Sequence, residues 1–353
     1  MSNVVQLRRH GFGRVDPAVP ALTGMFAARR RQQHDPFWLK ENAELLQVLA
    51  ASSVRDADLS PYEDFAINLT GELQFFPQYY RLYLSMAVDL RALGMRDAPV
   101  SEAADFIQSQ RLPEIELSDT HRGEADLLLR RAGVDLPADT ARSDRLAQFA
   151  ENAVAFCLPN RRAAYDLTHI VFHESDYGRR PTRPNAARRL SLIHAGLIAW
   201  LEDNMDLMAE IVIALRLQGE AVPKLWSDAV LHDAAEVEFH PGRDGARFDD
   251  DYHRYFVTNW ASAVLGQPFF TASVPTEARL IHQRLPRGAA LRELSMALLK
   301  MGSGRTSDWQ RMRWRVWGKL SEPARQRIAA VETMPEFEGF FEGFARAGKG
   351  SGN

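Results

Sequence analysis

The chain has a single cysteine, Cys157, among its 353 residues. One cysteine excludes an intramolecular disulfide, and it also excludes a zinc site built on paired cysteines. Cys157 stands in the apolar segment of residues 153–159 (AVAFCLP), where a free cysteine usually serves as a small buried hydrophobic side chain. We therefore look for the chemistry of this protein in other residue types.

Long apolar runs are also missing from the sequence. A helix that crosses a membrane needs about 20 consecutive apolar residues, whereas stretches such as residues 153–158 and 211–215 are far shorter. The N-terminal segment MSNVVQLRRHGFGRV lacks the apolar core of a secretory signal peptide. These two observations predict a cytoplasmic protein that does not enter a membrane.

Neither sign of charge is in large excess. Lysine and arginine together number 43, aspartate and glutamate number 46, and the formal net charge is −3. So small an imbalance provides no general attraction to nucleic acid or to an anionic membrane. Most of the basic residues are arginine, which we attribute to the codon usage of a GC-rich bacterium and not to function.

Helical periodicity is what the sequence has in abundance, whereas alternating strand patterns are rare. Residues 36–52 illustrate it, because a proline opens the first turn and apolar residues follow on one face. The predicted helices cover residues 36–52, 61–69, 75–94, 119–133, 143–157, 161–176, 185–202, 204–218, 224–237, 250–264, 275–284, 288–301, 306–319, 322–332 and 335–346, and one more begins at Ser101.

Short breaks that carry glycine or proline, such as residues 178–184 and 219–223, separate the predicted helices. Short connections favour antiparallel packing of neighbouring helices. The sequence therefore predicts an all-α fold of stacked antiparallel helical hairpins, either closed into an α/α toroid or left as an irregular helical domain. No repeat of fixed length is visible, which argues against a regular solenoid.

The two ends of the chain differ in composition from its body. Residues 1–34 are rich in arginine and hold a single acidic residue, Asp16. We predict a basic N-terminal arm over residues 1–34, a single helical domain over residues 35–346 and a flexible tail over residues 347–353. The arm is interpreted as a solvated extension, with contact to nucleic acid or to an acidic partner as the alternative.

The predicted helix over residues 161–176 has a polar face of unusual composition. At about 100° per residue, a strip about 80° wide holds Tyr165, His169, His173 and Asp176. Helix faces that meet solvent usually carry lysine, glutamate, arginine or glutamine. This strip instead carries aromatic, imidazole and carboxylate groups, and most of the remaining surface of the helix is apolar.

Such a strip is suited to metal binding or to acid–base chemistry. Imidazoles four residues apart, followed by a carboxylate, can supply several ligands to zinc or iron from one helix. A neutral imidazole is also a good general base when a carboxylate fixes its tautomer. The alternative is a set of hydrogen-bonded core residues without a function. Neither His-Glu-x-x-His nor Glu-x-x-His occurs in the chain, so the zincin and ferritin-type patterns do not apply.

Two further segments could complete a site. In residues 249–256 (DDDYHRYF), His253 shares a helical face with apolar and aromatic residues. In residues 202–217, Asp206 and Glu210 stand one turn apart, and a purely apolar run follows Glu210. A carboxylate buried there would need a partner or a raised pKa. As ligands of zinc or iron we predict His169, His173, Asp176 and His253, and as the proton donor or base we predict Tyr165 or Glu210.

The segments YDLTHIVFHESDYG and DYHRYF also carry a resemblance. They resemble an uncharacterised family of all-helical bacterial proteins with a Thr-His-x-x-Phe-(His or Tyr)-x-x-Asp-(Tyr or Phe)-Gly segment. The resemblance covers those two short segments. It implies that they lie together in the fold, and it implies no known activity.

Three functions remain open from the sequence. The first is a metal-dependent enzyme, with zinc or iron, that acts on a small-molecule substrate in a helical cavity. The second is a metal-free small-molecule binder or acid–base enzyme that uses the same side chains. The third is a helical scaffold for protein interactions, which would need an exposed apolar patch. Neither nucleic acid nor a membrane is an expected partner.

Overall fold

The computed structural model describes residues 18–55, 57–241, 250–275, 280–283 and 290–347. Within these residues the chain forms the helices α1 to α16, several short 3-10 turns and two short strands, which confirms the predicted all-α class. Closure into a toroid stays a prediction. None of the helices in the described residues is long and apolar enough to span a membrane.

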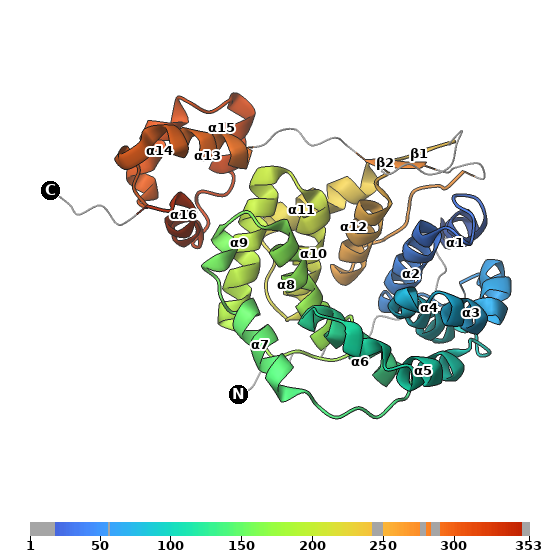
Figure 1. Cartoon of the computed structure of the whole chain (residues 1–353). Helices are drawn as coiled ribbons and strands as arrows, with labels where there is room; N and C mark the ends of the chain where they lie inside the picture. Colours follow the sequence, from blue (N-terminus) through green and yellow to red (C-terminus); the bar gives the residue numbers. More distant parts are fainter. Residues whose placement is uncertain (1–17, 56, 242–249, 276–279, 284–289, 348–353) are drawn as a thin grey trace, which may run out of the picture.

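The first group of helices, drawn from blue to teal in Figure 1, forms one side of the molecule. Within it α2 and α4 pack on each other, and α4 also contacts α5 and α6. Its members are α1 (Ala18–Ala28), α2 (Pro36–Ala51), α3 (Glu63–Phe75), α4 (Tyr80–Leu93), α5 (Val100–Ser109) and α6 (Asp119–Arg131).

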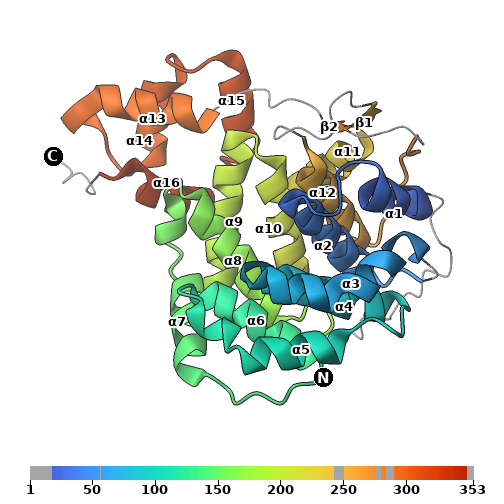
Figure 2. The same cartoon turned by 45° about the vertical axis from the view of Figure 1, so that its right-hand side comes forward.

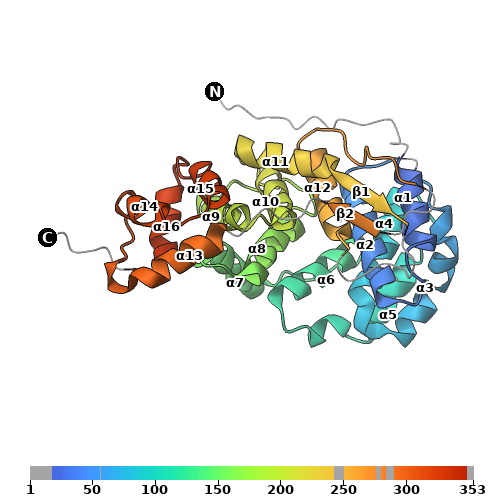
Figure 3. The same ribbon diagram turned by 90° about the horizontal axis from the view of Figure 1, so that it is seen from above.

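The second group of helices forms the middle of the molecule around α10. Its members are α7 (Thr140–Ala150), α8 (Arg161–Glu174), α9 (Ala186–Glu202), α10 (Met205–Leu217), α11 (Lys224–Ala235) and α12 (Tyr252–Val264). Figure 3, seen from above, shows α10 surrounded by α8, α9, α11 and α12, all of which contact it. The two groups meet where α12 contacts α2 and where α6 contacts α8.

Asparagine caps fix the starting points of α8 and α10. The side chain of Asn160 accepts a hydrogen bond from the backbone N–H of Ala163, and that of Asn204 accepts one from Leu207. A cap of this kind satisfies a backbone donor that the first helical turn leaves unpaired. The caps therefore set the position along each helix of the polar side chains that follow one and two turns later.

The helix predicted over residues 275–284 is wrong, because residues 280–283 form a strand. This strand, β2 (Leu280–Gln283), pairs antiparallel with β1 (Val237–His240). Partly buried and exposed residues alternate along β1, which is the pattern of a half-buried strand. With only four residues in each strand, the alternation is too short to stand out among helical patterns.

The C-terminal helices, drawn in orange and red, form a third group beside α9. Figures 1 and 2 both show them gathered there, and α13, α15 and α16 contact α9. Aromatic rings fill the space between them, since Trp309 packs edge-on against Phe337 and Phe341. The members are α13 (Ala290–Met301), α14 (Trp309–Trp317), α15 (Glu322–Ala329) and α16 (Phe337–Ala345).

Part of the predicted basic arm is buried in the body of the fold. Residues 1–17 lie outside the described residues, but α1 follows them and buries its apolar face. Beyond α1, the buried guanidinium of Arg30 pairs with Glu41 of α2 and with Asp250, which lies 220 residues away. Arg30 therefore ties the N-terminal segment to the start of α12. The predicted tail lies outside the described residues apart from Ala347.

Gly196 in α9 lies where a side chain cannot fit. A Cβ atom there would collide with the ring of Trp226, which is fully buried on α11. We expect Gly196→Ala to lower the free energy of unfolding by about 1–3 kcal/mol, because overpacking forces the ring or the helix to move. Urea unfolding followed by circular dichroism measures this change.

Gly71 in α3 is the matched control. Gly71 lies between the helices predicted over residues 61–69 and 75–94, but α3 runs through it to Phe75, and a Cβ at Gly71 meets nothing within 4 Å. Alanine is favoured over glycine inside a helix by about 1 kcal/mol. Gly71→Ala should therefore leave the stability unchanged or raise it. Equal losses in the two variants would contradict the close approach of α9 to α11.

Candidate metal centre

Helix α10 places two carboxylates, Asp206 and Glu210, one turn apart in the middle of the fold. The helix is apolar on most of its surface, and ten of its residues, from Met205 to Leu215 apart from Asp206, are buried. A carboxylate in such surroundings needs charged or hydrogen-bonding partners, because burial disfavours its ionised form. The partners come from α8 and α12, the helices that contact α10 on either side of this pair.

The buried carboxylate of Glu210 lies between two imidazoles. His253 Nε2 is 3.7 Å from Glu210 Oε1, and His169 Nε2 is 3.8 Å from Glu210 Oε2. Thr168 Oγ1 donates a hydrogen bond of 2.5 Å to Oε2. Both distances from nitrogen to oxygen exceed those of a hydrogen bond. The two imidazoles therefore face the carboxylate without binding it directly.

Asp206 orients His253. Its Oδ1 lies 2.7 Å from His253 Nδ1, and its Oδ2 accepts a hydrogen bond of 2.9 Å from the hydroxyl group of Tyr165. Because a carboxylate oxygen accepts, Nδ1 carries the proton, and Nε2 is turned toward Glu210. A carboxylate behind an imidazole in this way is the usual arrangement behind a metal-binding histidine.

Asp206, Glu210 and His253 form a compact cluster. Each offers one ligand atom, and these atoms all lie within 4.8 Å of one another. The cluster is open to solvent on one side, since the side chains of His169, His253 and Asp206 are 46%, 31% and 28% exposed, whereas that of Glu210 is 2% exposed. A small molecule could therefore reach the cluster from the edge where His169 lies.

The acidic surroundings hold a positive charge on His253. Burial alone would lower its pKa, but the carboxylates of Asp206, Glu44 and Glu210 outweigh burial and raise that pKa to about 10. Burial raises the pKa of Glu210, with the imidazoles of His169 and His253 opposing it. For Asp206, the contacts with His253 and Tyr165 outweigh burial and lower the pKa. The cluster attracts positive charge, and a divalent cation bound at Nε2 of His253 would displace the proton held there and supply that charge in its place.

Two further carboxylates approach from the first group of helices. Glu44 of α2 pairs with Lys40 at 2.7 Å, and its other oxygen is buried without a hydrogen-bond partner among the described residues. Glu124 of α6 is held by Arg81 and interacts electrostatically with His169 and His173. Arg81, followed by the two imidazoles, outweighs burial and lowers the pKa of Glu124. Glu124 is therefore ionised beside the imidazoles.

Four of the residues predicted from the sequence come together around α10, and two do not. Glu210 and His253 are members of the cluster, Tyr165 donates a hydrogen bond to Asp206, and His169 faces Glu210. His173 lies one turn beyond His169, and their ring centres are 5.8 Å apart. Burial lowers the pKa of His173 to about 4, so its imidazole is neutral near pH 7.

Asp176 lies away from the cluster because α8 ends before it. The helix ends at Glu174, and Asp176 has a positive φ of 48°. The helical geometry assumed from the sequence therefore does not extend to this residue. Its carboxylate faces Arg131 and Arg179 at 3.9 and 3.7 Å. Asp176 is part of an ion-pair network that connects the end of α8 to α6.

Sequence reasoning assigned no role to Asp206 or Thr168. Both lie in segments that carry predicted site residues, and the one-turn spacing of Asp206 and Glu210 is the signal that marks Asp206 as a candidate. Thr168 interrupts an apolar face one residue before His169. Glu44 and Glu124 carried no such signal, because carboxylates four residues from a lysine or near arginines look like ordinary surface residues.

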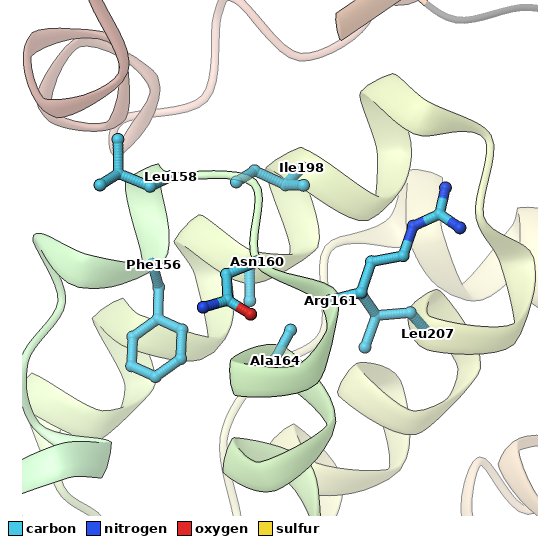
Figure 4. A pocket seen from close by; sticks show the side chains of 8 residues that line it. Phe156, Leu158, Asn160, Arg161, Ala164, Ile198 and Leu207 are labelled. Carbon is cyan, nitrogen blue, oxygen red and sulfur yellow. The ribbon is translucent and has the colours of Figure 1, made fainter. Parts of the chain in front are cut away.

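The pocket in Figure 4 lies apart from the cluster. Phe156, Asn160, Ala164 and Leu207 are among its lining residues, and none of the cluster residues is. Ala164 is about 140° around α8 from His169. Most of the lining is apolar, Asn160 is engaged as the cap of α8, and Arg161 pairs with Glu202. This pocket therefore offers no second set of reactive groups.

Cys157 and His194 form a thiol–imidazole pair whose composition resembles that of a nucleophile and its base. The Sγ atom lies 3.2 Å from Nδ1, but the same nitrogen lies 2.8 Å from the carbonyl oxygen of Ala153. Nδ1 therefore donates to a carbonyl and cannot accept the thiol proton. The thiol is buried, and burial raises its pKa to about 12. Cys157 thus has the structural role that its sequence context predicts.

We expect Cys157 in the native protein to resist thiol reagents. Only the thiolate reacts, and both burial and the raised pKa suppress it. Reaction with a chromogenic disulfide at pH 8 should be at least about 100-fold slower in the native protein than in urea. Stopped-flow absorbance gives both rates. Similar rates in the two states would show that the thiol is accessible and activated.

Comparison with known proteins identifies a family without an assigned activity. The chain matches, over residues 1–347, the family described as Domain of unknown function (DUF6902). Neither a curated protein nor a solved structure matches the chain. The chemistry therefore has to be inferred from the side chains themselves.

Proposed function

Since the chain belongs to the family Domain of unknown function (DUF6902), we propose a function from the geometry around α10. We propose that Glu210 and His253 hold a zinc or iron ion, and that the protein is a metal-dependent enzyme acting on a small molecule. The observation that carries the proposal is the buried carboxylate of Glu210 facing His253 Nε2 at 3.7 Å, with Asp206 fixing that imidazole from behind.

The donor atoms in the cluster match the proposed metals. Carboxylate oxygen and imidazole nitrogen suit Zn²⁺ and Fe²⁺, whereas a site for Mg²⁺ or Ca²⁺ is usually built from oxygen alone. The separation of 3.7 Å between nitrogen and oxygen is close to that of two ligands about 2.1 Å from one ion. Such an ion would act as a Lewis acid toward a substrate carbonyl or a water molecule.

The hydrogen bonds of the site give its residues separate roles. Glu210 would be a ligand, and Thr168 would hold its second oxygen in place. Both oxygens of Asp206 are engaged, by His253 and by Tyr165, so Asp206 would position His253 and Tyr165 would position Asp206. These roles differ from the proton donor or base expected of Tyr165 and Glu210 from the sequence.

A metal-free acid–base enzyme is the second candidate, favoured by the 2.7 Å contact between Asp206 and His253. The pKa of His253, raised to about 10, makes this imidazole a proton donor and not a base near neutral pH. This candidate predicts that removal of metal ions with a chelator leaves the binding of the small-molecule substrate unchanged. The metal-dependent enzyme predicts that a chelator abolishes it.

Zinc titration of the whole chain tests the first candidate. Protein made without a polyhistidine tag is stripped with EDTA, dialysed and titrated with Zn²⁺ in a calorimeter. We expect at least one equivalent to bind with a dissociation constant below about 1 μM. His232→Ala is the matched control, since His232 lies 3.2 Å from Glu236 in an exposed pair. Glu210→Gln should weaken zinc binding, and His232→Ala should leave it unchanged. Weak binding by the wild type, changed to the same extent by both substitutions, would overturn the proposal.

We expect Asp206→Asn to weaken zinc binding by about 10–100-fold, because a carboxylate behind an imidazole ligand contributes that much to metal affinity. Asparagine keeps the shape of the side chain but loses the charge that holds His253. Competition with a chromogenic chelator measures the affinity. Asp228→Asn is the control, since Asp228 pairs with Lys224 at the exposed start of α11. Unchanged affinity in Asp206→Asn would contradict the positioning role.

A further inference from the structure

Glu210 presents two edges, and an imidazole lies at each of them. His253 Nε2 faces Oε1 at 3.7 Å, and His169 Nε2 faces Oε2 at 3.8 Å. The two separations are nearly equal, and both fit a cation shared by the imidazole and the carboxylate. A carboxylate with a nitrogen ligand at each oxygen has the arrangement needed to bridge two ions.

One ion does not account for both imidazoles. Ligands about 2.1 Å from the same ion lie at most about 4.2 Å apart. The compact cluster of the described residues consists of Asp206, Glu210 and His253, and His169 is not part of it. His169 therefore lies beside Glu210 at a second position, next to Oε2, whereas His253 lies next to Oε1.

Two further potential ligands, His173 and Glu124, lie near His169. The side chain of His173 is nine-tenths buried, and its Nε2 has no hydrogen-bond partner among the described residues. A buried polar atom without a partner is costly, so a ligand that binds it would be favoured. Its ring centre lies 5.8 Å from that of His169. Glu124, on the adjacent helix α6, interacts electrostatically with both imidazoles.

We propose that a second divalent cation binds on the His169 edge of Glu210, with His169 and His173 as nitrogen ligands and Glu124 as a carboxylate ligand. This inference rests on the proposed function, because Glu210 would be shared between the two ions. The ligand atoms of these four side chains do not all lie within 4.8 Å of one another in the described structure, so the second ion would have to draw the side chains of α6 and α8 closer together as it binds. Sites with two ions bridged in this way stabilise both oxygens of an anionic group.

Metal counting on the whole chain tests this inference. Stripped protein is equilibrated by dialysis against Zn²⁺ alone and analysed by mass spectrometry of its metal content. We expect about two equivalents in the wild type and about one in Glu124→Gln and in His173→Gln. Glu210→Gln should lose both ions, because it removes the shared carboxylate. His232→Ala, which removes an exposed imidazole paired with Glu236 at the end of α11, should keep two.

The outcomes separate this inference from the proposed function. One equivalent in the wild type, unchanged by Glu124→Gln, would overturn the second ion and leave the first intact. No bound metal in the wild type would overturn both. If circular dichroism shows that His173→Gln is unfolded, Glu124→Gln decides the question, because its side chain is partly exposed and is held at one end by Arg81.

Discussion

His253→Ala should weaken zinc binding by more than about 100-fold. The loss of a ligand costs more than the loss of the residue behind it, which is about 10–100-fold. The substitution removes the Nε2 atom that faces Glu210 at 3.7 Å and leaves Asp206 without the imidazole that it orients. Competition with a chromogenic chelator gives the dissociation constants of both proteins.

His240→Ala provides the comparison for this loss. His240 lies at the exposed end of β1, 3.2 Å from Glu238, and belongs to no cluster of metal ligands among the described residues. Its affinity for zinc should equal that of the wild type. If His253→Ala keeps the wild-type affinity while remaining folded, then His253 is not a ligand, and the Asp206–His253 pair has another purpose.

Arg30→Met should lower the free energy of unfolding by about 3–5 kcal/mol, the largest effect on stability that we expect. The guanidinium of Arg30 is fully buried between the equally buried carboxylates of Glu41 and Asp250. Removal of one member of a buried ion pair leaves an unpaired charge in the interior. Glu41 retains Arg31, but Asp250 loses its bidentate partner. Urea unfolding monitored by circular dichroism measures the change.

Arg311→Met is the matched control for this substitution. Arg311 pairs with Asp308 on the surface of α14, and both side chains are largely exposed. A surface ion pair contributes less than about 1 kcal/mol. If Arg30→Met costs no more than Arg311→Met, then the N-terminal segment is not anchored to α12 through Arg30, and the arm predicted from the sequence is the better description.

The helices could be predicted because their apolar periodicity is local. The predicted helix over residues 224–237, for example, ends in the structure at Ala235. The segment at residues 280–283 could not be predicted, because its strand depends on pairing with β1, about 40 residues earlier. Arg30 is a second example. Its sequence neighbours suggest a basic arm, whereas its ion-pair partner Asp250 is distant in the sequence and could not be predicted from them.

The candidate site could be predicted only in part, because some of its features are local in the sequence and others depend on contacts between distant segments. The strip of polar residues on α8 is a local pattern, and in the structure two of its members, Tyr165 and His169, face the carboxylates of Asp206 and Glu210. The extension of that pattern to Asp176 failed at the end of α8, where backbone geometry changes and arginines of other segments bind the carboxylate. The proposed positioning role of Asp206 depends on its contact with His253. This contact joins α10 to α12, so no single segment of the sequence reveals it.

The two segments that carry the resemblance described from the sequence lie on helices that both contact α10. Helix α8 carries the first and α12 carries the second. The ring of Phe172 packs 4.8 Å from that of Trp260, which connects α8 and α12 directly. Their polar residues then meet at Asp206 and Glu210. The packing between the two helices is therefore what brings the candidate ligands together.

Anomalous diffraction from crystals grown with Zn²⁺ tests the central claim most directly. Data collected on either side of the zinc absorption edge locate the ion without assumptions about its ligands. We predict an anomalous peak about 2.0–2.2 Å from both a carboxylate oxygen of Glu210 and Nε2 of His253. A well-ordered cluster with no anomalous peak beside Glu210, in crystals that bind zinc elsewhere on the surface, would contradict a metal centre at this position.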